Sequence, residues 1–276
     1  MNSLPFEVYE NIWIKLRKKD LCSAALVNSQ WRFISYHMLY GHPKISCSKQ
    51  LILFSQIGPL AQTFVRVLDL KGVHQYVTDK LLQEYLQHLA CLKQINLDQC
   101  VHLSSSTINN LVQKNILSID SLSLSDCKIS KDTLTLIGKA CQYKLTSLDL
   151  SNTMIQPCSS IDSSNHLEDM IGISSPKLRH LDLSYCTWVN STTVKNIARG
   201  LPKLQHIILQ WCSQIKAEAI TEMVQQLLCL NTIDIRNIES IGTSEQVEGL
   251  MNEGSSLKKV MFTYKRSAIV QYPSYI

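Results

Sequence analysis

The chain has 276 residues, a length that suits a small module followed by a larger one. Hydrophobic residues make up 45% and charged residues 18%, which predicts a folded chain and excludes a disordered one. The net charge of +5 is mild, and its one basic run lies at 15–19, so we do not expect nucleic-acid binding. No stretch reaches the roughly 18 apolar residues of a membrane span. The first residues lack a secretory signal, so we expect a cytoplasmic or nuclear protein without a membrane partner.

Residues 1–45 predict a compact module of three short helices. Val8, Ile12 and Leu16 are spaced four apart and form one apolar stripe. Asp20 stands where it could cap a second helix, and the apolar residues of 31–38 indicate a third. Such helices could also serve only to cover the open end of the structure that follows them. We assign residues 46–64 to a linker or N-terminal cap.

Residues 65–265 repeat one motif, apolar-x-x-apolar-x-apolar-x-x-(Cys or small), about eight times. One clear copy is Leu92-x-x-Ile95-x-Leu97-x-x-Cys100, and the steps between copies are 27, 27, 26, 33, 26, 26 and 27 residues. The alternation predicts a short strand, and the dozen residues after it have helical spacing. Because one such unit cannot bury its apolar side alone, we expect an α/β solenoid with a concave parallel sheet and convex helices.

Polar residues precede the helical runs, where free backbone N–H groups need acceptors. The candidate caps are Thr78-Asp79, Ser104 to Ser106, Ser130 and Ser191-Thr192.

The ten cysteines form no Cys-x-x-Cys pair, so their spacing does not predict a zinc site. Four of them occupy the same position after the strand, and three more recur just before the next motif. We interpret all seven as small, buried apolar side chains. They are Cys100, Cys127, Cys186 and Cys212, and then Cys91, Cys141 and Cys229.

The side chains between the core leucines are expected to form columns along the concave face. The middle column contains Asp69, Asn96, Ser123, Asp149, Asp182, Ile208, Asp234 and Met261. The flanking columns contain Arg66, Gln94, Ser121, Ser147, His180, His206, Thr232 and Lys259, and then Lys71, Asp98, Ser125, Ser151, Ser184, Gln210, Arg236 and Thr263. The aspartates favour a partner with a basic segment, although a solvated sheet face is equally consistent with them.

Tyr185 and Trp211 occupy equivalent positions in adjacent repeats, so we expect them side by side, about one strand spacing of ~4.8 Å apart. Exposed aromatic pairs commonly anchor protein interfaces. The alternative is that Trp211 packs under the following loop. The predicted partner-binding surface contains Asp149, His180, Asp182, Tyr185, His206, Trp211, Asp234 and Arg236.

Two segments depart from the repeat. The step of 33 residues places an insertion in 154–175, which is either a recognition loop or a tolerated one. The tail, residues 266–276, either folds back along the concave face or caps the last repeat.

We expect neither catalysis nor a bound cofactor or metal. The histidines His180 and His206 lie one repeat apart, the repeat cysteines point into the core, and the glycines are isolated rather than arranged in a phosphate-binding loop.

The repeats resemble the cysteine-containing leucine-rich repeats of F-box proteins and of the fungal antagonist-of-mitotic-exit group. The first module is similar to the F-box, because Leu4-Pro5, Asp20-Leu21 and Val27-x-x-x-Trp31 fall at that family's spacing. The basic first loop and Val8-Tyr9 depart from the pattern.

This resemblance implies the substrate-recognition subunit of a cullin-RING (SCF-type) ubiquitin ligase. The F-box would dock a small adaptor, and through it a cullin and a RING subunit, while the repeats would hold a substrate for ubiquitination and proteasomal degradation. The alternative is a non-enzymatic scaffold that regulates a signalling or cell-cycle protein without ubiquitination. The matching adaptor-binding residues are Leu4, Pro5, Val8, Ile12, Leu16, Leu21, Val27 and Trp31.

Overall fold

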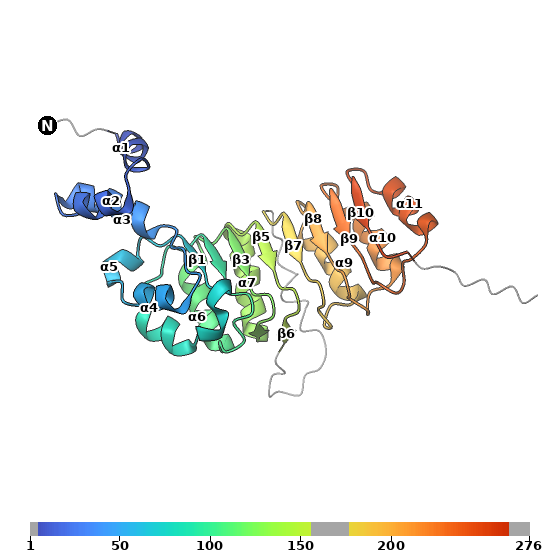
Figure 1. Ribbon diagram of the computed structural model, residues 1–276. Helices are drawn as coiled ribbons and strands as arrows, with labels where there is room; N and C mark the ends of the chain where they lie inside the picture. Colours follow the sequence, from blue (N-terminus) through green and yellow to red (C-terminus); the bar gives the residue numbers. More distant parts are fainter. Residues whose placement is uncertain (1–4, 156–176, 265–276) are drawn as a thin grey trace, which may run out of the picture.

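The computed structural model describes residues 5–155 and 177–264. In these residues eight short strands form one parallel sheet in the order β1-β2-β3-β5-β7-β8-β9-β10 (Figure 1). Their bounds are β1 Val67–Asp69, β2 Gln94–Asn96, β3 Ser121–Ser123, β5 Ser147–Asp149, β7 His180–Asp182, β8 His206–Ile208, β9 Thr232–Asp234 and β10 Lys259–Met261. A second, two-stranded sheet joins β4 (Lys128–Ile129) to β6 (Met154–Ile155). The predicted α/β solenoid is confirmed.

Helices cover the convex face of the sheet. They are α6 Ser105–Asn115, α7 Lys131–Tyr143, α9 Ser191–Gly200, α10 Ala217–Gln226 and α11 Ser244–Glu253. The first repeat has a 3-10 helix, η1 (Lys71–Tyr76), and a short π-helix, η2 (Leu81–Tyr85), instead. None of the helices in 5–155 and 177–264 is long and apolar enough to cross a membrane.

The helix caps mostly follow the sequence prediction. Ser104 and Ser130 each accept a hydrogen bond from the third residue of the helix that follows. For α9 the cap is Asn190 rather than Ser191-Thr192, because the Asn190 side chain accepts from the Thr193 N–H at 3.0 Å. In the pair Thr78-Asp79, the Thr78 hydroxyl accepts from the Leu81 N–H at 3.4 Å, whereas the Asp79 carboxylate accepts from the Ser104 N–H of the next repeat.

One continuous apolar core runs through all the repeats, from Ile45 to Leu257. Each strand contributes its central side chain and the residue after the strand, as Leu68 and Leu70 do in the first repeat, where both are fully buried. Because neighbouring repeats share this core, each covers the apolar side of the next.

The cysteine after the strand has a structural role in three turns of this core. The thiols of Cys127, Cys186 and Cys212 donate hydrogen bonds of 3.0–3.1 Å to main-chain carbonyls of the preceding repeat. The prediction for the cysteines before the motif is partly wrong. Cys141 is buried within α7, but Cys91 and Cys229 are exposed in the segments that precede β2 and β9.

The N-terminal module consists of α1 (Phe6–Trp13), α2 (Lys18–Ala24) and α3 (Ser29–Tyr40). It has its own small core around Trp13, Leu21 and Ile34. The Trp13 indole N–H donates to Ser35 Oγ at 3.0 Å. Asp20 is not a helix cap as expected, since it lies inside the first turn of α2, where its carboxylate pairs with Arg17 at 3.0 Å.

Two further helices, α4 (Ser48–Ser55) and α5 (Pro59–Gln62), connect this module to the sheet. The buried Phe64 then meets two rings of α3 edge to face, with centroid distances of 5.1 Å to Phe33 and 5.7 Å to Tyr36. The end of α3 is therefore joined to the segment that precedes the first repeat, and α1 and α2 project away from the solenoid (Figure 1).

Candidate functional site

Tyr185 and Trp211 form a pair of stacked rings at the corners that follow β7 and β8. The rings stack with centroids 5.9 Å apart and planes 17° from parallel, as their equivalent repeat positions predict. Tyr185 is 48% and Trp211 52% exposed, so Trp211 does not pack under the following loop.

Both residues stand at a corner where the backbone adopts a left-handed conformation, with φ values of 60° and 63°. Asp126, Asn152 and Asn237 occupy the same corner in other repeats, and asparagine and aspartate tolerate this region better than bulky side chains do. The corner is held because the N–H groups of Tyr185 and Trp211 donate to the next repeat at 2.9 and 3.0 Å. The rings therefore project from a fixed backbone.

His180 and His206 form a second stack at the start of β7 and β8. Their ring centroids are 4.5 Å apart and their planes differ by 2°. Burial, followed by His206 and then Arg179, lowers the pKa of His180. The ring of His206 also hydrogen-bonds the Thr232 hydroxyl. Parallel rings direct their nitrogen lone pairs along parallel planes, so this stack is not shaped to chelate one metal ion between the two rings.

The aspartates of the middle column differ in environment. Asp234 is 2% exposed, and Arg236 covers it with a two-pronged ion pair at 2.6 and 2.9 Å. This corrects the expectation that Asp234 presents a free charge to a partner, because its charge is already neutralised within β9 and its corner. In a flanking column, Lys71 pairs with Asp98 of the next repeat through a single contact of 3.1 Å.

Asp149 and Asp182 lie between these two ion pairs, in neighbouring positions of β5 and β7. The donors that reach them are neutral: Asp149 accepts from the Ser151 hydroxyl at 2.7 Å and Asp182 from the Ser184 N–H at 2.9 Å and hydroxyl. Burial is the main cause that raises the pKa of Asp182, and the charges of Asp149 and Asp234 add to it.

The strand register confirms the middle column and corrects one flanking column. Val67, not Arg66, pairs with Gln94 at the start of the sheet. The Arg66 guanidinium instead donates to the Thr63 carbonyl at 2.7 Å, so it belongs to the turn before β1.

The N-terminal module separates the predicted adaptor-binding residues into two groups. Leu21 is buried, and the half-buried Leu16 and Trp31 pack against the same small core. Pro5, Val8, Ile12 and Val27 are exposed, while Leu4 lies outside the described residues. Sequence patterning missed three further exposed apolar side chains near them, Ile14, Leu26 and Phe33.

No group of three or more metal-ligating side chains occurs in the part of the chain that the structure describes. The buried thiols are also unsuited to nucleophilic chemistry, because burial raises the pKa of Cys186 to about 11 and of Cys212 to about 12.

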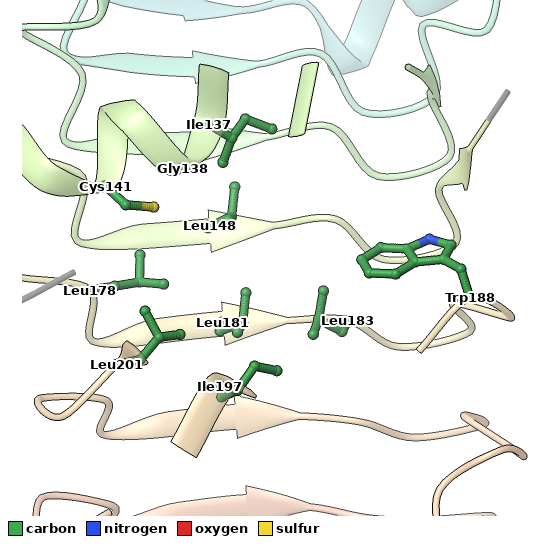
Figure 2. A pocket seen from close by; sticks show the side chains of 10 residues that line it. All are labelled: Ile137, Gly138, Cys141, Leu148, Leu178, Leu181, Leu183, Trp188, Ile197 and Leu201. Atoms are coloured by element: carbon green, nitrogen blue, oxygen red, sulfur yellow. The ribbon is translucent and has the colours of Figure 1, made fainter. Parts of the chain in front are cut away.

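An apolar pocket lies between α7 and α9 (Figure 2). Ile137 and Cys141 of α7 face Ile197 of α9 across Leu148 and Leu181 of the sheet. Except for β6, the predicted insertion 154–175 lies outside the described residues.

A family model described as "Leucine Rich repeat" matches residues 174–198. Among solved structures, Rad7 in the yeast Rad7 and Elc1 complex is similar at a TM-score of 0.53 and 17% identity, over 92% of this chain and 73% of that one. An internalin (InlF) from Listeria monocytogenes matches at a TM-score of 0.37 and 16% identity, over 80% of this chain and 65% of that one. Together with the parallel sheet and its buried leucines, the repeat match and the Rad7 fold establish that this chain is a leucine-rich-repeat solenoid with an N-terminal helical module.

Proposed function

We propose that this chain is the substrate-recognition subunit of a cullin-RING (SCF-type) ubiquitin ligase. Its helical module would dock the small adaptor, and its repeats would hold the protein to be ubiquitinated. The chain itself would contribute binding rather than catalysis, in the cytoplasm or the nucleus.

The observation that carries this proposal is the apolar surface of the three-helix module. Val8 and Ile12 lie one turn apart on α1, and Ile12 is 46% exposed. At the junction between α2 and α3, Val27 is 60% exposed. A module of this size has little reason to expose so many large apolar side chains unless another protein covers them. The F-box resemblance of the same residues supports an SCF adaptor as that protein.

The comparison with Rad7 supports the same arrangement. Rad7 has a similar fold and was solved in a complex with Elc1. The contacts of Phe64 with α3 would also hold a protein docked on the module at one end of the solenoid.

The proposal is tested with purified full chain and purified SCF adaptor in a size-exclusion or calorimetric binding assay. We expect a one-to-one complex that an Ile12→Asp, Val27→Asp double variant weakens at least about tenfold, because both charges would be buried on docking. Both residues are exposed, so the double variant is expected to keep its fold.

The matched control is Leu228→Asp, a charge at an equally exposed leucine between α10 and β9. This variant should bind the adaptor as the wild type does. If the wild type does not bind the adaptor, or if the control weakens binding equally, the ligase proposal is wrong and a scaffold that acts without ubiquitination becomes the better description.

A further inference from the structure

The ring pair of Tyr185 and Trp211 has the properties of a preformed binding platform. The two rings are near-parallel, half exposed, and fixed by backbone hydrogen bonds to the next repeat. A rigid aromatic surface loses little conformational entropy on binding, which is why such residues dominate the energetics of interfaces.

The aspartates of the face beside this platform differ in whether a basic side chain pairs with them. Lys71 covers Asp98 and Arg236 covers Asp234, whereas Asp149 and Asp182 between them have only hydroxyl and amide donors. Lys71 acts on Asp149 only through space, because its hydrogen bond goes to Asp98. The two adjacent carboxylates repel each other, so a positive charge brought by a partner is favourable there.

The two features lie within reach of one ligand. Tyr185 follows Asp182 by three positions, which corresponds to at most about 10 Å of extended backbone. An extended segment can thus place one side chain over the rings and another on the carboxylates.

We propose that this part of the concave face binds an arginine-bearing segment of the partner protein, stacked on Tyr185 and Trp211 and paired with Asp149 and Asp182. Arginine fits better than lysine because its planar guanidinium stacks on aromatic rings and binds carboxylates with two parallel hydrogen bonds. The inference rests on the proposed function only in taking the concave face as the surface that holds the partner.

The experiment measures the binding of the full chain to fluorescein-labelled peptides by anisotropy at low ionic strength. The probes are a peptide of repeated Gly-Ser-Arg units and the same peptide with lysine or with citrulline, the uncharged counterpart of arginine. We expect the arginine peptide to bind at least about tenfold more tightly than the citrulline peptide and several-fold more tightly than the lysine peptide. Added salt should weaken its binding.

Variants then locate the site. Trp211→Ala and Asp182→Asn should each weaken the binding of the arginine peptide by about fivefold or more. Trp211→Phe, which keeps an aromatic ring, should weaken it by less than about threefold. Each variant is first checked for an unchanged circular dichroism spectrum and thermal transition.

Two control variants make the same kinds of change outside the proposed site. Asp69→Asn removes one charge from the first position of the same column, and Tyr85→Ala removes a ring that is as exposed as Tyr185. Both should bind the arginine peptide as the wild type does.

Equal binding of the arginine and citrulline peptides, or no binding of either, would overturn the proposal. So would an equal loss in Asp69→Asn and Asp182→Asn, because net charge and not a site would then explain the binding. Equal binding of lysine and arginine would exclude arginine as the preferred residue. No adaptor is present in this assay, so its result is independent of adaptor docking: a chain that binds the peptide but not the adaptor overturns only the ligase proposal.

Discussion

The thiol of Cys212 donates a hydrogen bond to the main-chain carbonyl of Leu183 in the preceding repeat, with Sγ and oxygen 3.1 Å apart. Cys127 makes the same bond to Leu97. Burial raises the pKa of both thiols to about 12, so they stay protonated and keep donating at neutral pH. The cysteine of this repeat is therefore a small buried side chain that also satisfies a carbonyl group at the corner.

Native thiol labelling should separate the cysteines by burial. Cys91 and Cys229 are exposed, and we expect iodoacetamide to modify them in the folded chain. Cys212 should react only after denaturation, because its thiolate is scarce and its sulfur is inaccessible. Mass spectrometry of labelled peptides measures both rates. Comparable labelling of Cys212 and Cys229 without denaturant would contradict the role assigned to Cys212.

Replacing Asn115 with leucine should strongly destabilise the fold. The buried Asn115 amide accepts from the Leu92 N–H at 2.8 Å and donates to the Leu89 carbonyl at 2.9 Å, joining two repeats. Leucine would leave both main-chain groups buried and unpaired, which costs about 2–4 kcal/mol of unfolding free energy in total. Urea unfolding measures this change. The exposed Asn110→Leu on the same helix is the control and should change stability by less than about 0.5 kcal/mol.

The stability of the folded chain should depend on pH through His180. Because its pKa is lowered in the folded state, the unfolded chain binds a proton there at higher pH than the folded chain does. The stability that this shift contributes is complete above the ordinary histidine pKa of about 6.5. It is lost as the pH falls from there toward the lower pKa that His180 has in the folded chain. The raised pKa of Asp182 acts in the opposite direction, since the folded state then takes up that proton first as the pH falls.

A His180→Gln variant isolates the histidine. Urea unfolding on both sides of the ordinary histidine pKa should show a smaller loss of stability on acidification in the variant than in the wild type. Asp182 is present in both chains, so its opposite contribution affects both. Identical pH slopes in the two chains would contradict the prediction.

Removing the Phe64 ring should loosen the N-terminal module. Phe64→Ala deletes both edge-to-face contacts to α3 and leaves a cavity, so we expect a loss of about 3–4 kcal/mol. Limited proteolysis should then cleave faster within 41–66 than in the wild type. Leu60→Ala, an exposed position in α5, is the control and should leave the cleavage rate unchanged.

The repeat register could be predicted because a strand exposes every second side chain, so one set of buried leucines fixes all the columns. This periodicity alone predicts that His180 lies beside His206 and Tyr185 beside Trp211, and both pairs of rings are stacked. The exception is Arg66, predicted for a flanking column although the motif itself puts Val67 directly before the central Leu68. The residue that does pair there, Val67, is apolar and half-buried, whereas the other repeats carry a polar residue at this position.

The state of the individual charges could not be predicted from the columns. Asp149 and Asp234 occupy the same column, yet only Asp234 has an arginine two residues later that folds back over it. Likewise, Leu21 and Val27 both match an apolar pattern, but the fold of three helices buries one and exposes the other. Such differences arise from side-chain geometry across several elements, which a periodic pattern does not contain.

The number of strands in the sheet also sets a distance along the solenoid. β8 is the sixth strand from the module end, so Trp211 lies five strand spacings beyond the first repeat, or roughly 24 Å along the sheet at about 4.8 Å each. Deleting one whole repeat between β1 and β7 would move the ring pair toward the helical module by about one such spacing. The number of repeats, rather than any single side chain, therefore sets the separation between the two surfaces that this chain presents.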